Sequence, residues 1–234
     1  MASKSPIDDA PNDGLPPKNK FCIWKNSKAI EFGSWENAIP KNLFECERWI
    51  LSNVTEKQME IPSEMAYLNV TQELHLPYTL AYKTPETLGA DRISSTAGAI
   101  NEGFETAIII DCGTCIKIEV LSKKVYIGGS ISPGIFMRSR ALKDDTGKLP
   151  YVVPKAFSNN YGSSTEESIL CGVVQGASAE IEMRINRIQQ EIGECPVLIT
   201  GGDANLLQNH ILHKIFALPN LLHSGLFKLH SIND

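Results

Sequence analysis

The chain has 234 residues, of which 42% are hydrophobic and 21% are charged, and its formal net charge is −5. This composition is typical of a globular protein, and the length suits one large domain or two domains of about 100–120 residues each. The negative charge and the lack of a basic cluster in the sequence argue against nucleic-acid binding. No apolar run approaches the roughly 20 residues that span a bilayer, and residues 1–20 lack the apolar segment of a signal peptide. We therefore expect a cytoplasmic protein with no membrane or nucleic-acid partner.

The beginning of the chain predicts a leader followed by short elements. Residues 1–20 are rich in Pro, Asp, Asn, Lys and Ser, which predicts a disordered leader. Residues 21–24 and 28–32 predict the two strands of a hairpin. Residues 43–51 predict a short helix, which ends before a strand-like segment at 50–54.

The segment Tyr82–Arg92 carries the most informative polar side chains. Asp91 and Arg92 follow Gly89 closely and precede a run of small residues, 93–103, that predicts a tightly packed helix. A carboxylate can accept a proton from a hydroxyl, and a guanidinium can bind a carboxylate through paired N–H donors. The pattern indicates a site for a small molecule with a hydroxyl and a carboxylate. The alternative is an ordinary helix start, with Asp91 near the helix N-terminus and Arg92 in solvent.

The second half of the chain begins near Thr106 and predicts three antiparallel strands in series. The strands are expected at residues 107–111, 115–121 and 125–127, where apolar residues form a buried run or alternate. A glycine-bounded loop at 128–134 follows, and then a helix from 135 to 142.

A long helix is predicted to begin after Ser163. Ser164 and Glu167 have the spacing of a capping box, and apolar residues then recur at intervals of three and four, which gives one apolar face. Residues 196–200 predict another buried strand, followed by a glycine turn and a helix.

Cysteine and histidine residues give weak indications of a metal or redox site. The six cysteines are at positions 22, 46, 112, 115, 171 and 195. Cys112 and Cys115 form a C-x-x-C pair, but zinc would require a second pair or nearby histidines, and a thioredoxin-like motif would require a helix directly after it. We expect neither use. His210 and His213 have no acidic partner nearby in sequence, so we expect them at the surface or at an interface.

Three glycine-containing turns are expected after apolar strands, at residues 111–114, 128–130 and 200–203. Such turns offer bare backbone N–H groups to an anion. Asp111 and Asp203, beside two of these turns, could hold a cation or the water shell of magnesium, and Thr114 adds a hydroxyl group. The combination favours a nucleotide phosphate site.

The order and spacing of these motifs over about residues 43–229 resemble the type III pantothenate kinases. The matching motifs are Leu88-Gly89-Ala90-Asp91-Arg92, Asp111-Cys112-Gly113-Thr114, Gly128-Gly129-Ser130-Ile131-Ser132-Pro133-Gly134, Gly162-Ser163-Ser164-Thr165 and Thr200-Gly201-Gly202-Asp203. The resemblance implies an α/β protein with the actin-like ATPase fold. Two RNase H-like domains with mixed sheets flanked by helices would cover residues 21–105, with an incomplete first strand, and 106–234, with a dimerisation helix.

The resemblance also implies an activity and a set of site residues. The activity is ATP-dependent phosphorylation of pantothenate to 4′-phosphopantothenate, the first step of coenzyme A biosynthesis, by a homodimer. Asp91 would be the general base. Pantothenate would be bound by Tyr82, Gly89, Ala90, Asp91, Arg92 and, across the dimer interface, Thr165. ATP with Mg²⁺ would be bound by Asp13, Gly113, Thr114, Gly201 and Gly202. Asp111 would hold a monovalent cation, K⁺ or NH₄⁺.

Two positions depart from the family pattern. Asp13 is followed by Gly14-Leu15-Pro16-Pro17, where family members carry a D-x-G-N-T-like turn, and prolines remove N–H donors from a phosphate-binding turn. Lys117 stands where members often carry Thr. The alternatives to an active kinase are therefore a catalytically impaired binding or regulatory protein without the first phosphate-binding turn, or another enzyme of the actin-like superfamily, such as a sugar kinase.

Overall fold

The computed structural model describes residues 19–25, 28–35, 48–54 and 67–233. These residues belong to two compact units. Unit 1 comprises, among the described residues, Thr106–Val120 and Gly129–Pro219, whereas unit 2 comprises the described parts of Pro17–Glu105, Leu121–Gly128 and Asn220–Asp234. Each unit thus combines segments that are far apart in the sequence.

Unit 2 contains a four-stranded sheet in the order β2-β1-β3-β4. Its strands are β1 (Asn19–Lys25), β2 (Lys28–Trp35), β3 (Arg48–Ser52) and β4 (Tyr67–Asn69). β1 is antiparallel to β2 and β3, and β3 is parallel to β4, so the sheet is mixed. The predicted hairpin is confirmed as β1 and β2, and it begins within the predicted leader, at Asn19. The rest of the leader lies outside the described residues.

The helix predicted at residues 43–51 is wrong from Arg48 onward, and residues 43–47 lie outside the described residues. Arg48–Ser52 is strand β3, which confirms the strand-like segment predicted at 50–54 over residues 50–52 and pairs with β1 on one side and with β4 on the other. Trp49, Ile50 and Leu51 are consecutive and all buried, as in a strand covered on both faces. A short apolar run of this kind has no periodicity that separates a strand from a helix.

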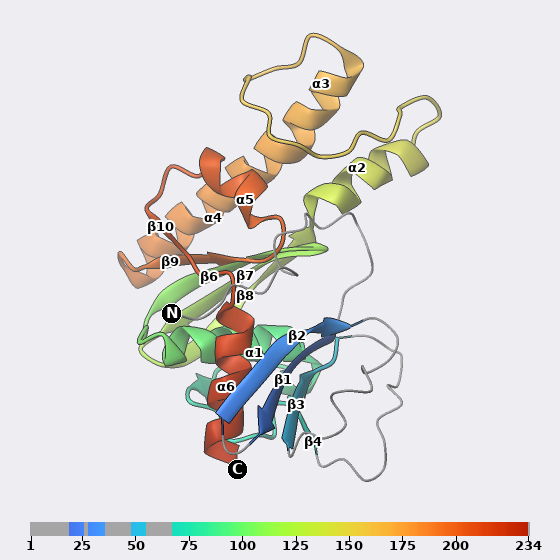
Figure 1. Ribbon diagram of the computed structural model, residues 1–234. Coiled ribbons are helices and arrows are strands. Elements are labelled where there is room, and N and C mark those ends of the chain that lie inside the picture. Colours follow the sequence, from blue (N-terminus) through green and yellow to red (C-terminus); the bar gives the residue numbers. More distant parts are fainter. Residues whose placement is uncertain (1–18, 26–27, 36–47, 55–66, 234) are drawn as a thin grey trace. The chain divides into compact units, whose positions relative to one another are not determined.

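Helices α1 (Ala90–Asn101) and α6 (Leu221–Asn233) pack against each other and against the four-stranded sheet (Figure 1). The two backbones approach closely at Gly98 and Gly225. A Cβ at Gly98 would lie 2.1 Å from the Leu221 carbonyl oxygen, and one at Gly225 would lie 1.7 Å from the Ser94 carbonyl oxygen. The small residues after Ile93 therefore form the tightly packed helix that the sequence predicts, and they do so because a second helix lies directly against them.

A six-stranded sheet has the order β10-β9-β6-β7-β8-β5. Its strands are β5 (Thr79–Leu80), β6 (Ala107–Cys112), β7 (Cys115–Ser122), β8 (Val125–Pro133), β9 (Val197–Thr200) and β10 (Ile215–Ala217). β9 lies between β6 and β10 and pairs in parallel with both. β5 pairs in parallel with residues 125–126 of β8, and this pairing lies within unit 2.

One face of this sheet in unit 1 carries the main apolar core. Ile108, Ile110 and Cys112 of β6 and Ile116 and Ile118 of β7 point to this face, where they meet helical residues such as Val174, Ile181 and Ile185. Because side chains alternate along a strand, Asp111 and Lys117 point to the opposite face. This alternation places the charged residues of β6 and β7 together.

The predicted loop at residues 128–134 is wrong, because β8 continues as a strand to Pro133. Gly128 adopts a φ of +139°, which glycine tolerates, so the strand runs through it. Only Gly134 lies outside the strand, as the residue that precedes helix α2 (Ile135–Asp144). The second predicted glycine turn, at 128–130, is consequently not a turn.

The long helix predicted after Ser163 is confirmed in position but is not uniform. It consists of α3 (Thr165–Leu170), a π-helical segment η3 (Cys171–Gln175) and α4 (Gly176–Ile192), which follow one another in Figure 1. Such π segments inside α-helices occur often at functional sites, and this one has no signature in the sequence pattern.

The remaining helical elements are short: η2 (Pro85–Thr87), α5 (Ala204–Leu207) and η4 (Gln208–His210). Within the described ranges, no helix combines the length and the apolar character needed to cross a membrane.

Candidate active site

The Asp91–Arg92 pair lies at the start of α1, in the first turn of the helix. The Asp91 Oδ1 atom accepts a hydrogen bond of 2.9 Å from the Arg92 backbone N–H, which orients the carboxylate. Gly89 precedes the helix, and a Cβ at this position would lie 2.6 Å from Asp91 Oδ1. Since Gly89 has an ordinary φ of −59°, the requirement for glycine here is steric: a side chain would displace the carboxylate.

Arg92 is a buried cation surrounded by aromatic rings. Its side chain is only 6% exposed, and its Cζ atom lies 5.6 Å from the centre of the Tyr82 ring and 5.9 Å from that of Tyr126. Its Nη1 atom also donates a long hydrogen bond of 3.5 Å to the Tyr82 hydroxyl. A guanidinium over two aromatic faces gains about 0.5–2 kcal/mol from each contact. The interpretation of Arg92 as a solvent-exposed residue of a helix start is therefore wrong.

Tyr126 is a site residue that the sequence pattern does not indicate. It is fully buried in β8 and lies 5.8 Å from Tyr82 and 6.4 Å from Tyr78, ring centre to ring centre. The Tyr78 hydroxyl in turn donates a hydrogen bond of 3.1 Å to the Ile93 carbonyl of α1. The three rings thus connect β8 to the start of α1 and orient Arg92. In the sequence Tyr126 is only one of several alternating apolar residues.

Unit 1 brings together three segments around the end of β6. The Gly134 N–H donates to the Thr114 carbonyl (3.0 Å), and the Asp203 N–H donates to the Cys112 carbonyl (2.9 Å). Glycine is required at two of these contacts. A Cβ at Gly134 would lie 2.1 Å from the Gly113 carbonyl oxygen, and one at Gly201, where φ is +97°, would lie 2.2 Å from the Cys112 carbonyl oxygen. The turns at 111–114 and 201–203 are therefore neighbours, as a shared phosphate site requires.

The expectation of bare N–H groups is only partly met in these turns. The Gly113 N–H donates to the Cys115 carbonyl (3.1 Å), and the Asp203 N–H is used as described. Gly113 and Thr114 are half-buried and Gly202 is exposed, whereas Asp203 is buried. The glycines keep the backbone uncovered by side chains, which allows a ligand to approach it closely.

Asp111 is paired with Lys117, which the sequence interpretation did not foresee. The Lys117 Nζ atom lies 2.7 Å from Asp111 Oδ2, and the two side chains are only 16% and 17% exposed. The other carboxylate oxygen, Oδ1, faces Gly201, where a Cβ would lie 2.6 Å from it. Both oxygens of the Asp111 carboxylate therefore have close neighbours within unit 1.

This arrangement does not fit the monovalent cation expected at Asp111. A cation bound to the same carboxylate would lie close to the Lys117 ammonium group, and two like unit charges about 4 Å apart repel by about 4 kcal/mol at an effective dielectric constant of about 20. Across the described ranges, no group of three or more His, Cys, Asp or Glu side chains is placed to hold a metal ion.

Thr165 begins α3, directly after the helix cap. The Ser164 hydroxyl accepts a hydrogen bond of 3.2 Å from the Glu167 N–H, as the capping box predicts. The Glu167 carboxylate receives the Ser163 N–H (2.7 Å) and the Ser163 hydroxyl (2.6 Å), which lower the pKa of Glu167. Thr165 lines a hollow of about 680 Å³ together with residues 162–164, Leu142, Leu149 and the following helix.

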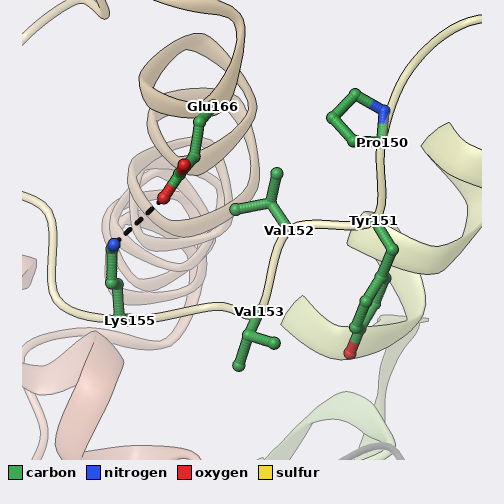
Figure 2. Close-up of a pocket in the computed structure, with 6 residues that line it drawn as sticks. All are labelled: Pro150, Tyr151, Val152, Val153, Lys155 and Glu166. Carbon is green, nitrogen blue, oxygen red and sulfur yellow. Dashed lines mark hydrogen bonds and ion pairs between the residues drawn. The ribbon is translucent and has the colours of Figure 1, made fainter.

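A second hollow in unit 1 contains none of the predicted site residues. It has a volume of about 330 Å³ and is lined by Pro150, Tyr151, Val152, Val153, Lys155 and Glu166. Figure 2 shows the side chains of Lys155 and Glu166 pointing toward each other, at a distance of 3.0 Å, while the Tyr151 ring points away from them. The two charges largely satisfy each other, so we assign no binding role to this hollow.

Cys112 and His213 have contacts that explain their places in unit 1. Cys112 is a buried free thiol, and burial together with the Asp111 and Asp203 carboxylates raises its pKa well above the usual range, which makes it a poor nucleophile. His213 has an acidic partner that is distant in the sequence: its Nδ1 atom lies 2.7 Å from Glu182 Oε1. Glu182 precedes it by 31 residues and also accepts the Leu212 N–H, so the pair anchors a loop to α4.

Comparisons with known proteins show which family this chain resembles. The family model of the type III pantothenate kinases matches residues 24–187. A type III pantothenate kinase from Christiangramia forsetii is 33% identical over 222 residues, which cover 88% of this chain and 91% of the relative. One from Porphyromonas gingivalis is 39% identical over 173 residues, covering 72% and 70%.

A crystal structure of a conserved putative Baf family transcriptional activator from Campylobacter jejuni is similar, with a TM-score of 0.51 and 22% identity, over 70% of this chain and 72% of that one. This likeness concerns the fold alone, and with the mixed sheets flanked by helices it confirms the expected α/β protein with an actin-like fold. The chain belongs to the type III pantothenate kinase family.

The predicted site residues divide between the two units. Tyr82, Gly89, Ala90, Asp91 and Arg92 lie within unit 2, and Asp111, Gly113, Thr114, Thr165, Gly201 and Gly202 lie within unit 1. Asp13 lies outside the described residues. Lys117 joins the candidate residues of unit 1 and Tyr126 joins those of unit 2, because of contacts that only the folded chain creates.

Proposed function

We propose that this protein transfers the γ-phosphoryl group of ATP to the hydroxyl group of pantothenate, which forms 4′-phosphopantothenate in the first step of coenzyme A biosynthesis. Membership of the type III pantothenate kinase family supports this activity. The observation that carries the proposal to particular residues is the first turn of α1, where the Asp91 carboxylate is oriented beside the buried Arg92. None of the comparisons favours a catalytically impaired protein.

In the proposed reaction, Asp91 is the general base. Its carboxylate accepts the proton of the pantothenate hydroxyl as the oxygen bonds to the γ-phosphorus, and the bond from that phosphorus to the bridging oxygen of ADP breaks. Arg92 binds the pantothenate carboxylate, since a guanidinium offers paired donors to such a group. Tyr82 contacts the substrate, while Gly89 and Ala90 let it approach the backbone. Positioning of this kind accounts for most of the catalysis in phosphoryl transfer.

ATP is proposed to bind at the glycine turns of unit 1. Gly113, Thr114, Gly201 and Gly202 would contact its phosphates, with Asp13 as a further contact outside the described residues. Mg²⁺ bound together with the nucleotide would neutralise negative charge on its phosphate groups. We do not assign the K⁺ or NH₄⁺ ion to Asp111, because the Lys117 ammonium group contacts that carboxylate.

The proposed enzyme is a cytoplasmic homodimer. Thr165, at the start of α3, would reach pantothenate across the dimer interface, and the helix from α3 to α4 would form much of that interface. Sedimentation velocity of the full chain tests this part separately from catalysis, because a monomer would leave no partner from which Thr165 could act.

Two measurements test the function. Coupled detection of ADP should show pantothenate-dependent turnover, and separate calorimetric titrations should show binding of both ATP and pantothenate. Pantothenate binding without ATP binding would support the impaired binding protein instead, as expected if the atypical segment at Asp13 has removed a phosphate contact. Binding of neither ligand by a folded protein would point to another enzyme of the actin-like superfamily.

A further inference from the structure

We propose that Lys117 supplies, as a tethered ammonium group, the positive charge that a monovalent cation would otherwise provide beside Asp111, so that the protein binds ATP and phosphorylates pantothenate without K⁺ or NH₄⁺. The inference rests on the proposed function, because the ligand whose binding it concerns is ATP. It starts from the disagreement between the expected cation and the ion pair at this position.

The Lys117 ammonium group contacts the Asp111 carboxylate directly. Lys117 Nζ lies 2.7 Å from Asp111 Oδ2, which is the distance of a direct charge-assisted hydrogen bond. Asp111 Oδ1 faces the Gly201 backbone. Ions of the potassium class require several oxygen atoms to replace their hydration shell, and here an ammonium group contacts one oxygen of the principal expected ligand.

The fold places the Asp111–Lys117 pair beside the turns that are proposed to bind phosphate. Asp111 is one residue from the end of β6, and in the parallel register of β6 and β9 it is the partner of Thr200. The side chains of Asp111 and Lys117 share the face of the sheet that is opposite the apolar core. The turn at 113–114 follows directly after β6, and the turn at 201–202 follows directly after β9. A positive charge held at Asp111 is therefore next to the proposed ATP phosphates.

The side chains of Asp111 and Lys117 are both partly buried. At 16% and 17% exposure, the pair is screened less by solvent and salt than the exposed pair of Lys155 and Glu166, whose side chains are 65% and 58% exposed. A lysine side chain is also covalently attached, so the site keeps its cation at any salt composition. Replacing Lys117 by Thr, the residue often found here in the family, would remove the charge and add an oxygen ligand.

The experiment compares the full-length protein and three variants in potassium chloride and in choline chloride at equal ionic strength. The variants are Lys117→Thr, which removes the ammonium group and adds a hydroxyl, Lys117→Met, which removes the charge without adding an oxygen, and Lys155→Thr, the matched control on an exposed ion pair. The readouts are the thermal unfolding midpoint, the ATP dissociation constant from calorimetry and the rate of pantothenate phosphorylation.

We expect the unmodified protein and Lys155→Thr to give equal values in both salts. Lys117→Thr should bind ATP about tenfold more weakly in choline than in potassium, which corresponds to about 1.4 kcal/mol, and potassium should raise its unfolding midpoint. Lys117→Met should be impaired in both salts. An unmodified protein that requires potassium for ATP binding or turnover would overturn the inference, and so would a folded Lys117→Thr variant that does not respond to potassium.

Failure of the proposed function would look different. If the unmodified protein bound no ATP in either salt, the kinase proposal would be wrong. The unfolding midpoints in the two salts would still show whether potassium stabilises the unmodified protein or only the Lys117→Thr variant. A Lys117→Thr variant that does not fold would leave the comparison of the unmodified protein in the two salts as the deciding measurement.

Discussion

The start of α1 in unit 2 and the glycine turns in unit 1 are two candidate binding regions built in different ways. At α1 the chemistry lies in side chains: a carboxylate, a buried guanidinium and aromatic rings that orient it. At the turns it lies in backbone, which glycines at 134 and 201 allow to come within contact distance of Cys112 and Gly113. Ligand binding at the start of α1 should therefore be sensitive to the loss of a functional group. Ligand binding at the glycine turns should instead be sensitive to the addition of a single Cβ atom.

Removal of the Asp91 base should have the largest effect. Asp91→Asn keeps the size of the side chain and leaves the Arg92 contacts with Tyr82 and Tyr126 in place. We expect turnover to fall by about 100- to 10,000-fold, the usual contribution of general-base catalysis, with little change in pantothenate affinity. Steady-state kinetics and calorimetry measure the two quantities separately. An unchanged rate would eliminate Asp91 as the base.

Gly89→Ala tests the same carboxylate without removing it. The new Cβ would lie 2.6 Å from Asp91 Oδ1, and because the carboxylate is the end of a side chain it would move rather than unfold the helix. A displacement of this order costs about 100-fold in rate, so kcat should fall while the unfolding midpoint changes little. Gly147→Ala, where no atom lies within 4 Å of the added Cβ, is the control. Equal kinetics in the two variants would mean that the Asp91 position does not matter.

Gly201→Ala should break the backbone region of unit 1. Two costs combine there: about 1–2 kcal/mol for a side chain in the left-handed conformation and about 1–3 kcal/mol for overpacking against the Cys112 carbonyl. Gly193 also has a positive φ, of +90°, and no atom lies within 4 Å of an added Cβ, so Gly193→Ala shows the effect of a side chain at positive φ without a close contact. We expect Gly201→Ala to lose more stability in urea unfolding and to lose ATP binding. Similar losses in both variants would show that conformation, not close approach, requires the glycine.

Arg92→Lys should have a smaller effect, confined to the side-chain region. Lysine keeps the positive charge but loses the planar group that stacks on Tyr82 and Tyr126 and pairs with a carboxylate. We expect KM for pantothenate to rise about tenfold, the equivalent of about 1.4 kcal/mol, with KM for ATP unchanged. A rise in KM for ATP alone would place Arg92 with the nucleotide instead.

The smallest expected effect is at the cap that precedes Thr165. Hydrogen bonds from Ser163 lower the pKa of Glu167 in the folded protein, so its contribution to stability is present above the pKa of the unfolded chain and is lost as pH falls through the folded value. Glu167→Gln should be slightly less stable than the unmodified protein at neutral pH, and the difference should vanish in acid. Urea unfolding at both pH values measures this, and a difference that grows in acid would contradict it.

Local sequence determined much of this protein. The strands at β6, β7 and β9, the capping box at Ser164 and the small residues of α1 follow from alternation, spacing and residue size, which are properties of neighbouring residues. The acid–guanidinium pair could be identified for the same reason, since its members are adjacent. β3, the glycine segment of β8 and the π segment η3 differ from expectation because pairing and packing with distant segments outweigh local preference there.

What only the tertiary structure decided is which charges and rings meet. Tyr126 reaches Arg92, Glu182 reaches His213, and Lys117 reaches Asp111 on the neighbouring strand. The sequence by itself indicated the family, the acid at 91 and two of the three expected glycine turns, those at 111–114 and 200–203. Folding decided that the Asp111 carboxylate has an ammonium partner, because an electrostatic interaction depends on distance in space and on burial, neither of which is set by separation along the chain.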